Sequence, residues 1–195
     1  MSRLISSLLD GAFGDMIDIV LVNNSPEISL GECMDRRVTV VVLENPGYGA
    51  AMNRGALALD SNVSHLLLLT HEVSISDETI AALMSRLNDR PSTGIVGPLL
   101  LDSRNSDLVW SAGNRQRRWT GKPKSPERGM KRSALEGVKQ CDWLDGATLM
   151  VRLQEFRLLG GFDERFFLYV EDVELGWRYR SAGFKVECLL NYPAH

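Results

Sequence analysis

Short apolar runs recur along this chain, and stretches of helical character separate them. The clearest are Val-Thr-Val-Val-Val-Leu at 38–43 and four leucines at 66–69, and further runs occupy 17–22, 94–101 and 185–190. Runs that are apolar at nearly every position are typical of strands covered on both faces, as in a parallel sheet. The alternation therefore predicts an α/β fold, a three-layer sandwich with a mostly parallel sheet.

The intervening segments carry helix signals. Residues 4–9 look like the end of an amphipathic helix, and residues 50–59 are small and apolar. Ser76 is expected to cap a helix that has acids in its first turn and stops before Pro91. Residues 171–182 predict a further helix with Val173 and Trp177 on one face.

Composition excludes several classes of protein. The 195 residues, of which 44% are hydrophobic, fit a single domain spanning 1–195, and the net charge of -3 gives no general attraction to nucleic acid. No stretch approaches the roughly 18 apolar residues that span a bilayer. Three widely spaced cysteines, Cys33, Cys141 and Cys188, predict reduced thiols in a cytoplasmic protein.

Residues 114–132 differ from the rest of the chain. They are rich in lysine and arginine, with glycine and proline between, and are expected to form a mobile basic surface loop. Such a loop is either solvated without a role or an acceptor-side lid that attracts phosphate-bearing substrates.

Two segments follow strands directly and could hold a ligand. Residues 44–55 are glycine-rich and open a helix, whose N-terminus favours an anion such as a pyrophosphate; such turns also serve packing alone. Glu72 follows the leucine strand, at the edge where open α/β sheets bind ligands, and could hold magnesium or manganese. The alternative is that Glu72 is merely solvated before a helix.

Two acidic segments lie in the second half. Asp142-Trp143-Leu144-Asp145-Gly146 is the shorter, and residues 160–174 combine aromatic residues with five acids. Acids near 171 would stabilise a helix N-terminus, which is the simpler explanation. Aromatic residues beside carboxylates also build a desolvated pocket in which a carboxylate can act as a base.

Taken in order, the motifs resemble the rhamnosyltransferase-like branch of glycosyltransferase family 2, over nearly the whole chain. They are Asn45-x-Gly47-Tyr48-Gly49 with Asn53-x-Gly55, Gly94-Ile95-Val96-Gly97-Pro98, Trp143-Leu144-x-Gly146-Ala147, and Gly160-Gly161-Phe162-Asp163-Glu164-x-Phe166-Phe167 with Glu171-Asp172-Val173-Glu174 and Arg178. The resemblance implies the Rossmann-like GT-A fold of nucleotide-diphospho-sugar transferases. It also implies inverting transfer of a hexosyl or rhamnosyl group from a nucleotide-sugar donor.

The resemblance assigns a role to each matching residue. Asp172 matches the catalytic base, with Glu171 beside it, and Glu72 with His195 would hold a divalent metal, Mg²⁺ or Mn²⁺. The acceptor and sugar side matches Trp143, Asp145 and Gly146. The donor side matches Asn23, Asn24, Asn45, Gly47, Tyr48, Asn53 and Glu72.

The sequence also departs from the family. Asn23 stands where relatives carry an acid, Thr70 stands at the first position of the metal motif, and the usual first strand is absent. Unpaired strand edges would then need a cover, which favours a homodimer. Two alternatives follow: an inactive GT-A-like module that binds a nucleotide sugar or a protein, and, less favoured, a nucleotidylyltransferase.

Bacterial relatives typically build surface polysaccharides. By analogy, the acceptor is a glycan or a lipid-linked sugar, and the protein associates peripherally with the inner face of the membrane. No nucleic-acid partner is expected.

Overall fold

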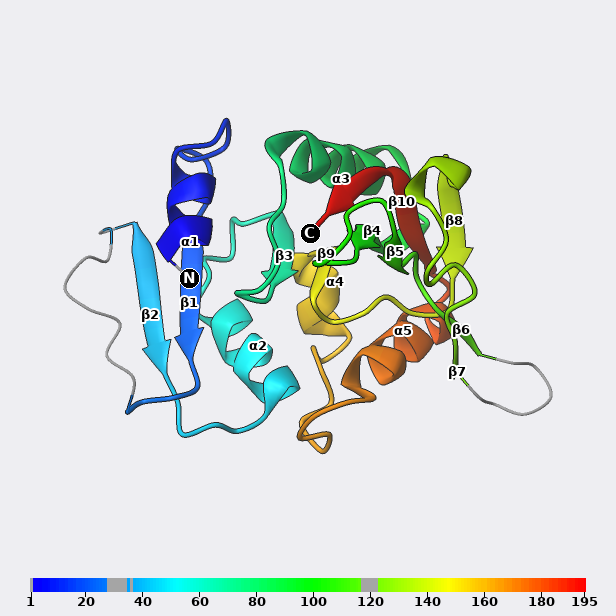
Figure 1. Cartoon of the computed structure of the whole chain (residues 1–195). Helices are drawn as coiled ribbons and strands as arrows, with labels where there is room; N and C mark the ends of the chain where they lie inside the picture. Colours follow the sequence, from blue (N-terminus) through cyan, green and yellow to red (C-terminus); the bar gives the residue numbers. More distant parts are fainter. Residues whose placement is uncertain (1, 28–34, 36, 117–122) are drawn as a thin grey trace.

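Strands carry the apolar runs, and helices occupy the segments between them (Figure 1). The computed structural model describes residues 2–27, 35, 37–116 and 123–195. The helices are α1 Ser2–Leu9, α2 Tyr48–Leu57, α3 Asp77–Asp89, α4 Leu153–Leu158 and α5 Glu171–Ser181, with a 3-10 turn η1 at Arg132–Ala134. The strands are β1 Ile19–Asn23, β2 Val38–Val42, β3 His65–Leu69, β4 Thr93–Leu101, β5 Val109–Ser111, β6 Arg115–Gln116, β7 Pro123–Lys124, β8 Val138–Cys141, β9 Thr148–Arg152 and β10 Lys185–Ala194.

The main sheet is mixed. Its strand order is β3-β9-β4-β10-β8, with β5 beside β4, and β4 and β10 run parallel while the other pairs are antiparallel. The α/β layer prediction holds, but the expectation of a mostly parallel sheet does not. Apolar runs report burial on both faces, and a three-layer sandwich buries an antiparallel strand as completely as a parallel one.

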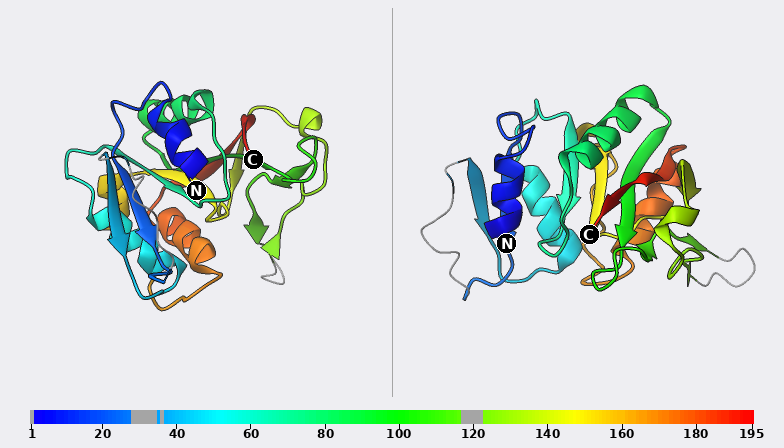
Figure 2. Two further views of the ribbon diagram at one scale, coloured as in Figure 1. Left: turned by 60° about the vertical axis from the view of Figure 1, so that its left-hand side comes forward. Right: turned by 45° about the horizontal axis from the view of Figure 1, so that its top comes forward.

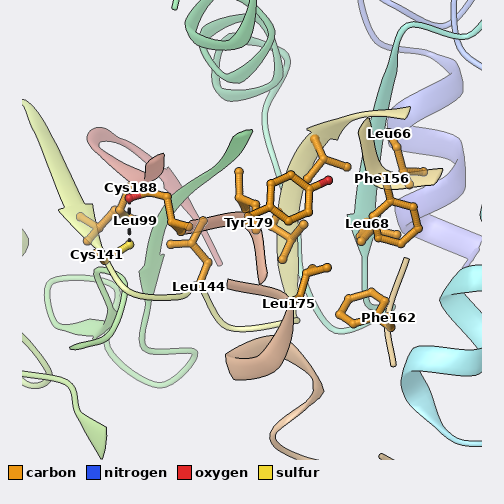
Figure 3. Close-up of a cluster of buried hydrophobic side chains, with 14 of the residues drawn as sticks. Leu66, Leu68, Leu99, Cys141, Leu144, Phe156, Phe162, Leu175, Tyr179 and Cys188 are labelled. Atoms are coloured by element: carbon orange, nitrogen blue, oxygen red, sulfur yellow. Dashed lines mark hydrogen bonds between the residues drawn. The ribbon is translucent and has the colours of Figure 1, made fainter. Parts of the chain in front are cut away.

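Helices cover both faces of this sheet, as the alternation along β4 shows. Ile95, Leu99 and Leu101 contribute to one buried cluster, which α2, α4 and α5 complete. Val96 and Leu100 contribute to the other, which α3 covers. Figure 3 shows the first cluster running from Cys141 and Cys188 past Tyr179 to Phe156 and Phe162. The hydrophobic layers therefore sit on either side of β4.

A second, two-stranded sheet holds β1 and β2, which pair in parallel. It lies at one side of the molecule near α1 (Figures 1 and 2). Helix α2 contacts it closely, because a Cβ added at Gly55 would lie 3.0 Å from Val22 Cγ2, while Ala56 belongs to the core of the main sheet. A single domain over 1–195 stays a prediction.

The helix signals match the structure at α3. Ser76 is its N-cap, with Oγ accepting a hydrogen bond from Thr79 N at 3.2 Å. In α5 the predicted face is wrong: Trp177 is 59% exposed, whereas Glu171, Leu175 and Tyr179 are buried. These three recur every fourth residue and so form one stripe, and the aromatic character of Trp177 gave the misleading signal.

The basic segment is partly regular. β6 and β7 pair as a short antiparallel hairpin, in which Arg115 faces Lys124, and residues 117–122 lie outside the described residues. Its mobility stays a prediction. Among the described helices, none has the length and apolar content needed to cross a membrane.

The cysteines agree with reduced thiols where the structure describes them. Cys141 and Cys188 are buried and free, and Cys33 lies outside the described residues. Burial raises the pKa of the Cys141 thiol to about 12 and also raises the pKa of Cys188. Both side chains therefore behave as core residues rather than nucleophiles.

Candidate active site

Strained backbone delivers Asp172 to its position. Tyr169 and Val170, directly before α5, both adopt left-handed conformations, with φ of 67° and 73°. Left-handed backbone is unfavourable for a β-branched residue such as valine, and strain of this kind is concentrated at functional sites. Because the chain turns sharply there, Asp172 falls in the first turn of α5, where the helix dipole favours a negative charge.

The Asp172 carboxylate is half-buried and accepts two backbone hydrogen bonds. Oδ2 accepts from Gly146 N at 3.2 Å, and Oδ1 accepts from Val173 N at 2.8 Å. Burial raises the pKa of Asp172 to about 6; the two hydrogen bonds oppose this rise, and the charges of Asp145 and Glu171 add to it. A carboxylate that titrates near neutral pH is suited to accept a proton from a substrate.

Gly146 joins the donor-side and acceptor-side segments. Its carbonyl accepts a hydrogen bond from the Tyr48 hydroxyl, while its N–H donates to Asp172. The Tyr48 ring packs edge-on against Phe162, with centroids 5.6 Å apart, and a Cβ at position 146 would lie 3.1 Å from the Tyr48 ring. The structure thus brings together three residues from the predicted set: Tyr48, Gly146 and Asp172.

Burial also raises the pKa of Tyr48, and the charges of Glu171 and Asp172 contribute. Glu171 is 6% exposed, and its Oε2 is buried without a hydrogen-bond partner. Glu171 therefore lies in a desolvated region against the first turn of α2, since a Cβ at Gly49 would be 3.7 Å from Glu171 Cβ.

The N-terminus of α2 is partly occupied by the protein itself. Tyr48 N donates to Phe167 O at 3.0 Å, so this amide is satisfied without an anion. Asn45 Oδ1 accepts from Gly47 N at 3.4 Å, and Asn45 is exposed at the turn.

Asn53 serves the fold more than a ligand. Its Oδ1 accepts from Phe162 N at 2.8 Å, and its Nδ2 donates to Phe162 O at 2.9 Å and to Glu164 at 3.1 Å. The side chain clamps residues 162–164 onto α2, and these bonds would have to break before it could bind a donor.

Asn23 and Asn24 lie at the end of β1, in the two-stranded sheet rather than in the main sheet. Asn23 Oδ1 accepts from Ser25 N at 3.0 Å, and Leu43 N donates to Asn23 O at 2.9 Å. Asn24 Oδ1 is buried and has no hydrogen-bond partner. An unpaired buried amide oxygen is costly and could accept a hydrogen bond from a ligand.

The segments that carry Glu72 and His195 lie side by side. Glu72 follows β3, where Thr70 N donates to Ala147 O at 3.0 Å, next to Gly146. Ser74, two residues later, pairs through its backbone with His195 in both directions, at 2.6 and 2.9 Å. Both Glu72 and His195 are exposed, and within the described ranges no group of three or more His, Cys, Asp or Glu could hold a metal ion.

Trp143 belongs to the core rather than to an open sugar site. It is 6% exposed, and a Cβ at Gly176 would lie 2.6 Å from its Cβ. The neighbouring Asp145 is half-buried, and its Oδ2 accepts from Asn114 Nδ2 at 3.0 Å. Sequence reasoning missed Asn114, because a single asparagine in a loop carries no motif.

Comparisons with known proteins give relatives of one kind. The chain is 31% identical over 159 residues to an N-acetylglucosaminyl-diphospho-decaprenol L-rhamnosyltransferase of Mycobacterium tuberculosis, covering 72% of this chain and 52% of that protein. It is 28% identical to the O-antigen biosynthesis protein RfbC of Myxococcus xanthus, covering 96% of this chain and 15% of RfbC. The chain thus spans about half the length of the first relative and a much smaller part of the second. No protein-family model matches it.

Among solved structures, GalNAc-T7 crystallised with UDP, GalNAc and Mn²⁺ superposes with a TM-score of 0.73 at 15% identity, covering 98% of this chain and 40% of GalNAc-T7. At that identity the likeness shows the fold alone. The chain is therefore similar to a bacterial rhamnosyltransferase over 72% of its length, and it has the GT-A glycosyltransferase fold.

Proposed function

We propose that this chain transfers a hexosyl group, rhamnose above all, from a nucleotide-sugar donor to a glycan or lipid-linked acceptor, with inversion. The observation that carries the proposal is the half-buried Asp172 carboxylate, held by Gly146 N and with its pKa raised to about 6. A carboxylate that only capped α5 would be most stable when exposed and with an ordinary pKa. A proton acceptor instead benefits from burial, because burial raises its pKa toward neutral.

Asp172 takes the proton from an acceptor hydroxyl as that oxygen attacks the anomeric carbon. The new glycosidic bond forms on the face opposite the leaving group, the bond to the nucleoside diphosphate breaks, and the diphosphate leaves with the electron pair. Gly146 N–H and Val173 N–H keep the Asp172 carboxylate oriented throughout. Asp145 and Gly146 line the acceptor side, and the donor occupies the side of Asn23, Asn24, Asn45 and Tyr48.

Glu72 and His195 would hold Mg²⁺ or Mn²⁺, which supplies charge neutralisation for the departing diphosphate. An exposed carboxylate and an exposed imidazole fit such an ion, since magnesium sites often use one or two protein ligands and complete the shell with phosphate oxygens and water. With only two candidate ligands, metal binding depends on the donor. A lipid-linked acceptor would bring the chain to the inner face of the cytoplasmic membrane.

Thermal unfolding with nucleoside diphosphates and nucleotide sugars, each with and without Mn²⁺, tests the donor site. A ligand at roughly 100 times its Kd adds about 2.7 kcal/mol, and about 1 kcal/mol moves the Tm of a chain this size by roughly 2–4 °C. We expect a rise of several degrees with one nucleotide that requires Mn²⁺. Glu72→Gln should remove the Mn²⁺ dependence of this Tm rise. Glu78 is an exposed acid in α3, and Glu78→Gln should leave the dependence unchanged.

The outcome separates the proposal from its alternatives. A Tm rise without sugar transfer to any acceptor would favour an inactive nucleotide-sugar-binding module. Release of pyrophosphate from a nucleoside triphosphate would favour a nucleotidylyltransferase.

The rate should depend on pH through Asp172. Because the ionised carboxylate is the active form, we expect kcat/KM for the acceptor to rise about tenfold per pH unit below about 6 and to level off above it, as for a single ionisation with that pKa. A pH–rate profile with saturating donor checks this. A midpoint near pH 4 in this profile would show that the proton acceptor is instead an exposed carboxylate with an ordinary pKa.

A further inference from the structure

A buried asparagine lies between the basic hairpin and the acceptor side of the site. Asn114 is 3% exposed and immediately precedes β6. Its backbone is fixed on the segment that leads to Gly146, since Asn114 N donates to Trp143 O at 2.9 Å and Asp142 N donates to Asn114 O at 2.8 Å. The side chain is therefore held in place independently of any ligand.

Both ends of the Asn114 amide are used. Nδ2 donates to Asp145 Oδ2 at 3.0 Å, and Oδ1 accepts from the Ser125 hydroxyl, one residue after β7. The two contacts fix which way the amide points, because its oxygen side is taken by a donor and its nitrogen side by a carboxylate. A hydrogen bond to a charged partner is roughly twice as strong as one between neutral groups.

Asp145 in turn acts on Asp172. Its charge contributes to the raised pKa of Asp172, together with that of Glu171; Tyr48 is the other titratable group coupled to this carboxylate. Asp145 immediately precedes Gly146, whose N–H is bonded to Asp172. The position of the Asp145 carboxylate therefore affects both the acceptor side and the proton acceptor.

We propose that Asn114 is a positioning residue that holds the Asp145 carboxylate beside Asp172 and ties the basic hairpin to the acceptor side of the site. The proposal rests on the proposed function, in which Asp145 contacts the acceptor. Asn114 itself touches neither donor nor acceptor, so its effect passes through Asp145.

Two substitutions should have opposite effects on Asp172. Asn114→Ser releases Asp145 toward solvent, so the pKa of Asp172 should fall below about 6. Asn114→Asp places a further carboxylate against Asp145, and like charges disfavour ionisation, so the pKa should rise. Titration of the Asp172 carboxyl carbon by NMR measures both shifts. Asn105→Asp, on the exposed turn before β5, is the matched control and should leave the titration unchanged.

Kinetics supply the second readout. Both Asn114 variants should raise the KM for the acceptor about 10- to 100-fold, the equivalent of one charged hydrogen bond, with the donor-induced Tm rise unchanged. A variant that loses Tm while the Asp172 titration and the acceptor KM stay at wild-type values would overturn the proposal and leave Asn114 a structural residue. If the wild type shows no transfer, the proposed function fails, and the titration alone still decides whether Asn114 positions Asp145.

Discussion

Asp172→Asn should lower kcat by about 10²–10⁴-fold, the usual contribution of a general base, and leave donor binding near the wild-type value. The amide cannot accept the acceptor proton, yet it keeps the size of the carboxylate and can still accept a hydrogen bond from Gly146 N or Val173 N. Single-turnover transfer measures the rate, and the donor-induced Tm rise measures binding.

Stability gives this variant an independent signature. The folded pKa of Asp172, about 6, lies above the ordinary aspartate value of 3.8, so the folded state binds the proton more tightly than the unfolded state. The contribution of Asp172 to the free energy of unfolding therefore falls as pH rises from about 4 to about 6. Above pH 6 the ionised, half-buried carboxylate keeps its full destabilising penalty. Asp172→Asn lacks the penalty and should be more stable at pH 8, by on the order of 1 kcal/mol, but not at pH 3.

Asp163→Asn is the matched control. Asp163 lies in the same acidic segment, but its carboxylate pairs with exposed Arg165, which lowers the pKa of Asp163 to about 2. This variant should keep wild-type kcat. If Asp172→Asn retains full turnover, or if Asp163→Asn loses as much, the proton acceptor has been assigned to the wrong residue.

The sequence predicted those parts of the fold that depend on local chemistry. The Ser76 cap, the strand runs at 38–43 and 66–69 and the strand-to-helix turn at Gly47 all depend on neighbouring residues. The direction of β9 could not be read in this way, because it pairs with β3 and β4 through contacts far apart in sequence.

The same distinction holds for the site. The family motifs identified Tyr48, Gly146 and Asp172, but the bond from the Tyr48 hydroxyl to Gly146 O joins residues 98 positions apart. The engagement of Asn53 with Phe162 and the burial of Trp143 are likewise tertiary properties. A motif records which residue types are present and not whether their polar atoms are already satisfied.

Gly47→Ala should produce the largest loss of stability among the substitutions considered, because two costs act at one position. Gly47 has φ of +96°, which an alanine adopts only with strain, and an added Cβ would lie 2.3 Å from Phe167 O. Left-handed strain costs about 1–3 kcal/mol, and forcing an extra carbon into packed backbone adds about 1–3 kcal/mol more. We expect a total loss of about 2–6 kcal/mol, measured as a lower urea midpoint.

Gly183→Ala is the control without a clash. Gly183 follows α5 with φ of +92°, so an alanine there is also strained, but nothing lies within 4 Å of an added Cβ. This variant should lose only a contribution from backbone strain, so a larger loss in Gly47→Ala reports the clash with Phe167 together with the extended ψ of 168° at Gly47. Equal losses would mean that the Phe167 carbonyl moves aside freely.

The clash also connects stability to catalysis. Phe167 O accepts from Tyr48 N, and the chain runs from Phe167 through the left-handed residues Tyr169 and Val170 into α5. Displacing Phe167 should therefore disturb the approach to Asp172, and Gly47→Ala should lower kcat at temperatures where the variant is still folded. Gly183→Ala lies at the opposite end of α5 and should keep wild-type kcat under the same conditions. A folded Gly47→Ala variant with full kcat would show that α5 holds Asp172 without help from the turn at Gly47.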